Sequence, residues 1–226
     1  MRWRLAALCG SICLMLMACA AQGPSPKARG PAWQPATVAV MPFSVVRPGP
    51  GQDVVRCPIT GAYFRPGVVA PGAEAAMDAL MGRLAPRMLA PRVLDPARTR
   101  LAYQRVLGKA VGWPTRAQLA ALGRRLGAQA VIVGFIYRFR ERVGPPLAAS
   151  RPAAVTFDLT AIRCSDARVM WHRAFDAVQQ PLSQNILGLG RYLRYGFKWL
   201  TARELAEAGL REVLASCPWA AKGEKQ

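Results

Sequence analysis

The sequence is poor in the residues that most enzymes use. It has one histidine, His172, and 12 Asp and Glu against 31 Lys and Arg. The motifs Gly-x-Ser-x-Gly, His-Glu-x-x-His and Cys-x-x-Cys are absent, and no pair of carboxylates has the shared face that a glycosidase site needs. We therefore expect neither an enzyme nor a cofactor, and we interpret His172 as a structural residue rather than an acid or base.

Cysteines are few and widely separated in the part of the chain that we expect to fold. Cys57, Cys164 and Cys217 lie beyond the N-terminal region. Zinc sites need closely spaced ligands, so no metal site is predicted. Three cysteines allow one disulfide with one free thiol, or no disulfide. The sequence leaves both alternatives open.

The longest uncharged run near the N-terminus is too short for an ordinary membrane span. Arg2 and Arg4 precede residues 5–17, which carry no charge. As a helix this run is about 20 Å long at 1.5 Å per residue, against about 30 Å of hydrocarbon. The run ends in Leu16-Met17-Ala18-Cys19. This leader resembles the signal peptide and lipobox of bacterial lipoproteins.

The resemblance implies that residues 1–18 are a signal peptide and that Cys19 carries acyl chains, palmitate among them. Several chains on one residue give stable membrane anchoring. Ala20 follows the cysteine where lipoproteins of the inner membrane often have Asp, so the outer membrane, on its periplasmic side, is expected. Two alternatives remain, a transmembrane helix extended to Ala21 and an unlipidated secretory signal.

The charge of the chain is strongly positive. Its formal net charge is +19, and arginine supplies most of the excess. Arginine pairs with phosphate and carboxylate in bidentate geometry, so lipid head groups, lipopolysaccharide or an acidic protein are plausible partners. Export from the cytoplasm argues against nucleic acid.

After the signal peptide of residues 1–18, composition divides the chain into three further parts. Residues 19–36 hold the lipidated cysteine and a Pro-rich tether, residues 37–218 form one α/β domain, and residues 219–226 are a tail. Residues 47–72 hold five prolines and five glycines, which is typical of a functional or mobile loop. A hairpin is predicted inside it, with residues 53–57 against residues 62–65.

Helices and strands alternate along the domain. A buried strand over residues 38–43 should end or bulge at Pro42, and an apolar stripe predicts a helix over 73–84 that Pro86 stops or kinks. Residues 92–94 are a short strand. Capping boxes at Thr115/Gln118 and Thr201/Glu204 open two further helices.

Three segments between these last two helices alternate with period two. Phe135, Tyr137 and Phe139 alternate with Ile136, Arg138 and Arg140. The same pattern recurs over residues 155–161 and 169–176, which predicts an antiparallel meander with one buried face. The fold class is therefore α/β, with a mixed sheet in the order β-α-β-α-β-β-β-α and helices packed on the sheet.

Three blocks of this pattern resemble a known superfamily. They are Val38–Phe43, which ends in Pro-Phe, then Leu122–Gly134, a helix stop followed by an apolar strand, and Asp166–Trp171 at a tight turn. They are similar to the TolB N-terminal domain, CsgG and LpoB. The resemblance implies a fold and no catalytic residues. Residues 47–72 and 179–200 depart from the shared pattern.

Two surfaces are candidate binding sites. The segment 181–199 interleaves aromatic and cationic side chains, which suits anionic lipid or a protein partner, or else an ordinary helix packed on the sheet. Its candidate residues are Arg191, Tyr192, Arg194, Tyr195, Lys198 and Trp199. Arg138, Arg140 and Arg142 form a possible anion-binding stripe, or a solvated edge whose charge Asp158 offsets across the strands.

These observations predict a non-enzymatic outer-membrane lipoprotein that binds envelope proteins as an accessory or assembly factor. An alternative is a subunit of an oligomeric envelope or secretion complex, although residues 47–72 are too rich in Pro and Gly to supply barrel strands easily. An envelope hydrolase is less favoured, because no catalytic set is present. The sequence identifies neither the partner nor the oligomeric state.

Overall fold

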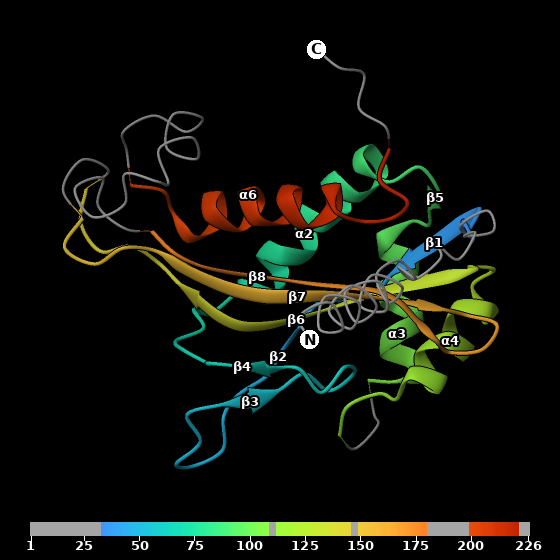
Figure 1. Cartoon of the computed structure of the whole chain (residues 1–226), viewed down its shortest axis with the longest axis horizontal. Helices are drawn as coiled ribbons and strands as arrows, with labels where there is room; N and C mark the ends of the chain where they lie inside the picture. Colours follow the sequence, from blue (N-terminus) through green and yellow to red (C-terminus); the bar gives the residue numbers. More distant parts are fainter. Residues whose placement is uncertain (1–32, 109–111, 146–148, 180–198, 222–226) are drawn as a thin grey trace, which may run out of the picture. The chain divides into compact units, whose positions relative to one another are not determined.

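The computed structural model describes residues 33–108, 112–145, 149–179 and 199–221, and the folded unit begins at Gln34. Six strands form one mixed sheet in the order β5-β1-β6-β7-β8, and β2 (Ser44–Val45) also pairs with β6. Helices lie on both faces of this sheet (Figure 1). The predicted fold class is confirmed. No helix within the described stretches is both long and apolar enough to cross a membrane.

The parallel half of the sheet is built around a short central strand. β1 (Thr37–Val40) pairs with β5 (Arg92–Val93) on one side and with the start of β6 (Ala130–Arg140) on the other. Helix α2 (Ala73–Met88) connects the part of the chain after β1 to β5. β1 ends two residues before Pro42, as its missing N–H predicts.

The antiparallel half is the predicted meander. β7 (Ala154–Arg163) pairs with β6, and β8 (Val169–Val178) pairs with β7. The turn between β7 and β8 includes Ala167 at a φ of 57°.

The expectation of one buried face is wrong, because both faces of β6 and β7 are covered. Thr156, Asp158 and Thr160, on the polar side of the pattern, are each 0% exposed. Helices α2 and α6 (Ala202–Ala215) cover one face, and the hairpin β3 (Val55–Arg56)–β4 (Tyr63–Phe64) lies on the other with α3 and α4 (Figure 1). We call these the helix face and the hairpin side.

The strict alternation predicted for β6 is wrong after Ile136. The register with β7 shifts between Ile136 and Arg138, which makes Tyr137 the extra residue of a β-bulge. Phe135 pairs with Asp158, and Arg138 pairs with Thr156. Asp158 and Thr156 are two residues apart on β7, so they lie on the same face of the sheet. Arg138 therefore shares the hairpin side with Phe135.

The helices follow their capping signals. Both predicted capping boxes are present, at the N-termini of α4 (Arg116–Arg125) and α6. Pro86 does not end α2, which runs on to Met88, because a proline in the last turn removes only one intrahelical hydrogen bond.

One helix was not predicted. Helix α3 (Pro96–Val106) begins at Asp95, whose side chain accepts a hydrogen bond from the Ala97 amide. It buries only Thr99 and so has no apolar stripe. The available signal was the Asp-Pro pair at its N-terminus.

A glutamine side chain joins two described residues, Gln179 and Leu200, which flank the residues that the structure does not describe. The buried Gln179 side chain accepts a hydrogen bond from the Leu200 amide at 2.7 Å. The Gln179 amide itself donates to the Ala153 carbonyl. This glutamine therefore links the end of β8 to the chain just before α6.

We expect Gln179→Ala to lower the free energy of unfolding by about 1–3 kcal/mol, because a buried amide loses its acceptor. Urea denaturation measures the change. Gln52→Ala is the matched control, since Gln52 makes the same kind of bond to the Gly49 amide at an exposed position. Equal stabilities of the two variants would contradict the structural role of Gln179.

Candidate functional site

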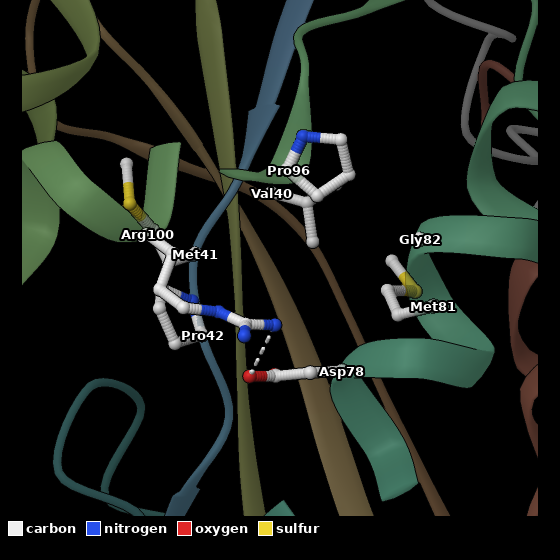
Figure 2. Close-up of a pocket in the computed structure, with 8 residues that line it drawn as sticks. All are labelled: Val40, Met41, Pro42, Asp78, Met81, Gly82, Pro96 and Arg100. Atoms are coloured by element: carbon white, nitrogen blue, oxygen red, sulfur yellow. Dashed lines mark ion pairs between the residues drawn. The ribbon is translucent and has the colours of Figure 1, made fainter. Parts of the chain in front are cut away.

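The crevice at the carboxyl end of β1 is the first place to look for a ligand. The chain leaves β1 toward β5 on one side and later returns to β6 on the other, and ligands of open α/β sheets bind at such switch points. Val40, Met41 and Pro42 line the crevice together with residues of α2 and α3 (Figure 2). Its volume of about 20 Å³ holds about one water molecule.

An ion pair closes this crevice. Asp78 lies 3.4 Å from Arg100 and accepts a hydrogen bond from the Phe43 amide at 2.8 Å. Burial raises the pKa of the Asp78 carboxyl, while the Phe43 amide and Arg100 act in the opposite direction. These contacts fix the chain after β1 to α2, which is a structural role.

A second concentration of polar groups lies inside the sheet. The Asp158 carboxylate, in the middle of β7, is fully buried, and its Oδ2 atom lies 3.0 Å from Nε2 of His172 on β8. The imidazole is 27% exposed. His172 is thus the partly exposed partner of a buried carboxylate.

Tyr137 and Cys57 border the same carboxylate. Burial first, and then the negative charge of Asp158, raise the pKa of the Tyr137 hydroxyl and of the Cys57 thiol. A thiol with a raised pKa stays protonated and is a poor nucleophile. No thiol–imidazole contact occurs in the described part of the chain, so Cys57 and His172 do not form a nucleophile–base pair.

Three oxygen atoms of this cluster have no hydrogen-bond partner among the described residues: Tyr137 Oη, Asp158 Oδ1 and Thr160 Oγ1. Unpaired buried polar atoms cost stability. The His172 contact therefore matters for the fold, because it is the ion-pair contact of a carboxylate that is fully buried.

We expect His172→Ala to destabilise the fold by roughly 1–3 kcal/mol, since it leaves a buried carboxylate without a donor; the partial exposure of the imidazole keeps the loss below that of a fully buried pair. Urea unfolding provides the measurement. His172→Gln, which keeps a donor, should recover part of the loss. An alanine variant as stable as the parent would refute this assignment.

Above this cluster lies the hairpin β3–β4. The Phe64 ring stacks on the Tyr137 ring, with centroids 3.9 Å apart and planes 11° from parallel. Val55, Cys57 and Ile59 are buried beneath the hairpin. The turn is closed by the Cys57 amide, which donates to the Ala62 carbonyl at 2.7 Å. The predicted hairpin is confirmed, and its inner side is part of the core.

The chain after the hairpin is fixed to β6. The amides of Gly67 and Ala70 donate to the carbonyls of Tyr137 and Phe139, and the Phe139 amide donates to Val68, at 2.8–2.9 Å. The segment 47–72 is therefore fixed to β6 through residues 67–70 and is not a free loop, while β3 and β4 form a separate two-stranded sheet.

The outer side of the hairpin exposes both cationic and apolar groups. The register pairs Arg56 with Tyr63, and its continuation places Val54 beside Arg65. The Arg56 guanidinium carbon lies 5.0 Å from the centroid of the Tyr63 ring. Tyr63 is 68% exposed and Val54 is 44% exposed. We call these four residues the hairpin face.

The hairpin face has the composition of a protein-binding surface. Arginine and tyrosine are enriched at protein interfaces, and arginine pairs with carboxylates in bidentate geometry. Within residues 47–72 the single acidic residue is Asp53, against Arg47, Arg56 and Arg65. The sequence predicted a functional or mobile loop here but did not identify these four side chains, because their common orientation depends on the strand register.

The arginine stripe holds loops of the protein itself. Arg138 donates to the Arg65 carbonyl at 3.2 Å and lies 3.7 Å from Asp176. Arg140 donates to the Pro152 carbonyl, and Arg142, which follows the end of β6, donates to the Gly144 carbonyl. The stripe as an anion-binding site stays a prediction.

The expected role of Asp158 beside these arginines is wrong. Asp158 pairs with Phe135 and contacts His172, and Asp176 on β8 is the carboxylate near Arg138. Arg138 pairs with Thr156, two residues along β7 from Asp158, and Asp176 pairs with the same Thr156 from β8.

The other predicted site residues are only partly covered by the structure. Cys19 and the candidates Arg191, Tyr192, Arg194, Tyr195 and Lys198 lie outside the described residues, and Trp199 is half-buried. Cys57, Cys164 and Cys217 are buried and unpaired, which settles the open disulfide question for the described part of the chain. No three His, Cys, Asp or Glu side chains among the described residues are placed to hold a metal ion.

Comparison of the chain with family models and with curated protein sequences gives no match. Among solved structures, the PelC dodecamer from Paraburkholderia phytofirmans is similar at a TM-score of 0.45 and 13% identity, covering 82% of this chain and 90% of that chain. Lipoprotein GNA1162 from Neisseria meningitidis is similar at a TM-score of 0.42 and 11% identity, covering 72% of this chain and 100% of that chain.

The LpoB C-terminal domain from Escherichia coli is similar at a TM-score of 0.34 and 15% identity, covering 64% of this chain and 83% of that chain. LpoB is one of the three proteins that the sequence blocks resemble, whereas the resemblance to TolB and CsgG stays a prediction. Structural similarities with TM-scores and identities this low do not support an inference about function.

Proposed function

We propose that this chain is a non-enzymatic lipoprotein of the bacterial cell envelope that binds another envelope protein through the hairpin face. The leader and Cys19 support the lipid anchor, and Ala20 supports the outer membrane with the domain in the periplasm. The partner is a protein with carboxylates beside an apolar group, because the hairpin face combines two arginines with Tyr63 and Val54.

The anchoring of the hairpin is the observation that carries this proposal. Its inner residues are locked into the core and its outer residues are exposed, so the face is rigid before any partner arrives. Binding to a preorganised surface avoids much of the entropy cost of ordering a loop. An exposed tyrosine with a guanidinium already against its ring also loses little side-chain freedom on binding.

The interior of the protein supports a role without catalysis. The crevice at the switch point has room for about one water, and burial keeps the Cys57 thiol protonated. Membership of an oligomeric envelope or secretion complex is the alternative, and an envelope hydrolase is the least favoured function.

Replacing Arg56 and Tyr63 by alanine should abolish partner binding without unfolding the domain, because both side chains point outward. We would place a photo-crosslinking residue at position 53, where the exposed Asp53 borders the hairpin face, and identify adducts from native envelopes by mass spectrometry. The double variant should lose the adduct by about tenfold or more, as expected when interface hot spots are removed.

The matched control is the Arg98→Ala, Leu101→Ala variant on α3, which removes an exposed arginine and an exposed apolar residue elsewhere on the surface. It should keep the adduct. If both double variants crosslink like the parent protein, the hairpin face is not the binding surface.

Cys19→Ser should prevent lipidation and processing. In the lipobox interpretation the variant keeps the mass of the full chain and is lost from the outer-membrane fraction. Fractionation with intact-mass measurement tests this. A variant that remains in the outer membrane to the same extent as the parent would show that another element anchors the chain.

A further inference from the structure

The two helices on the hairpin side carry positive charge that nothing in the described part of the chain neutralises. α3 contacts α4, and both lie on that face of the sheet (Figure 1). Each helix has three arginines and no acidic residue. Asp78 pairs with Arg100, and Arg124 donates to the Cys164 carbonyl. The other four arginines are exposed and form no ion pair with a described residue: Arg98, Arg105, Arg116 and Arg125.

Three residues of α3 form a cationic surface with an apolar centre. Arg98, Leu101 and Arg105 have the i, i+3, i+7 spacing of one helix face, on the side away from the buried Thr99. Leu101 is 48% exposed. We call these three residues the α3 face. A helix that exposes leucine beside arginines has the composition of one that lies on an anionic membrane surface.

Two more apolar side chains are exposed shortly after the α3 face. Val106, the last residue of α3, is 45% exposed, and Trp113 is 44% exposed. The Trp113 ring packs edge-on against Phe135, with ring centroids 5.4 Å apart, so one part of the ring is held and the rest is open to solvent. Tryptophan is enriched where a membrane meets water.

The N-terminal chain enters the domain beside the end of α4. The Ala36 amide donates to the Gln129 side chain at 2.6 Å, and the Gln129 amide donates to the Thr37 carbonyl at 2.9 Å. Gln129 lies four residues after the last residue of α4, Arg125. A lipid on Cys19 would therefore tether the domain to the membrane from the side that carries these helices.

We propose that the α3 face binds the anionic phospholipid surface to which the chain is anchored. This inference rests on the lipid anchor of the proposed function and adds an orientation of the domain to it. The arginines are attracted to anionic head groups, and Leu101 enters the boundary between head groups and acyl chains. Because the anchor keeps the domain close to the surface, a weak contact is sufficient.

The spread of the charge favours a lipid surface over an acidic protein. The four exposed arginines without an ion pair are distributed over the length of two helices. A protein partner would need carboxylates placed opposite each of them, whereas an anionic membrane presents negative charge across its whole surface. The hairpin face differs in this respect, because its groups are gathered on two short paired strands.

A fluorescent probe on α3 tests the contact. Leu101→Cys in the lipidated chain can be labelled with the fluorophore NBD, because Cys57, Cys164 and Cys217 are buried and Cys19 is acylated. In vesicles of phosphatidylcholine and phosphatidylglycerol with brominated acyl chains, the probe should be quenched. In vesicles of brominated phosphatidylcholine alone, the quenching should be lost.

Ala215→Cys carries the control label. Ala215 is exposed at the end of α6, on the opposite face of the sheet, so the probe there should stay unquenched in both kinds of vesicle. Equal quenching at positions 101 and 215 would overturn the proposed orientation.

Charge reversal tests the role of the arginines. Arg98→Glu with Arg105→Glu should weaken the contact of the labelled protein with anionic vesicles by about tenfold or more, since each arginine near the surface contributes to binding. Arg87→Glu with Arg203→Glu changes the net charge equally at exposed positions of α2 and α6 and should keep the quenching. Circular dichroism checks that both variants fold.

Vesicle flotation separates this inference from the proposed function. If the labelled chain floats with the vesicles but is not quenched at position 101, the anchor stands and the α3 face is refuted. A chain that floats with neither kind of vesicle would refute the anchor and the orientation together. The Arg98→Ala, Leu101→Ala variant keeps the anchor and the hairpin face, so it should retain the protein adduct while it loses the lipid contact.

Discussion

β6 is paired almost continuously along the edge that faces away from β7, and the rest of the structure depends on this constraint. β1 pairs with the first residues of β6, β2 (Ser44–Val45) with Phe135 and Ile136, and the chain at 67–70 with the last part. Between the first two segments the chain passes directly over Gly134, where a Cβ atom would lie 2.3 Å from the Phe43 ring. The path of residues 37–72 is therefore fixed by one strand.

This path buries polar residues, which costs stability. Because the hairpin between β2 and residue 67 lies over the sheet, it covers the polar residues of β7, including Asp158 and Thr160. The Phe64–Tyr137 stack and the buried side chains of β3 offset this cost, and His172 supplies the contact that the Asp158 carboxylate needs. The inner side of the hairpin is therefore buried and stabilises the fold, and only its outer side is accessible to a partner.

Local signals in the sequence predicted most elements correctly, and long-range pairing explains the errors. The capping boxes at Thr115 and Thr201 act within one turn, so sequence alone located both helices. Helix α3 was missed because it buries almost nothing, and an element without an apolar face leaves no periodic pattern. The burial of Asp158 depends on a hairpin that lies far away in the sequence, at residues 55–64, and no local pattern reports such a contact. The hairpin face was missed for the same reason, because only the pairing of β3 with β4 brings its four residues together.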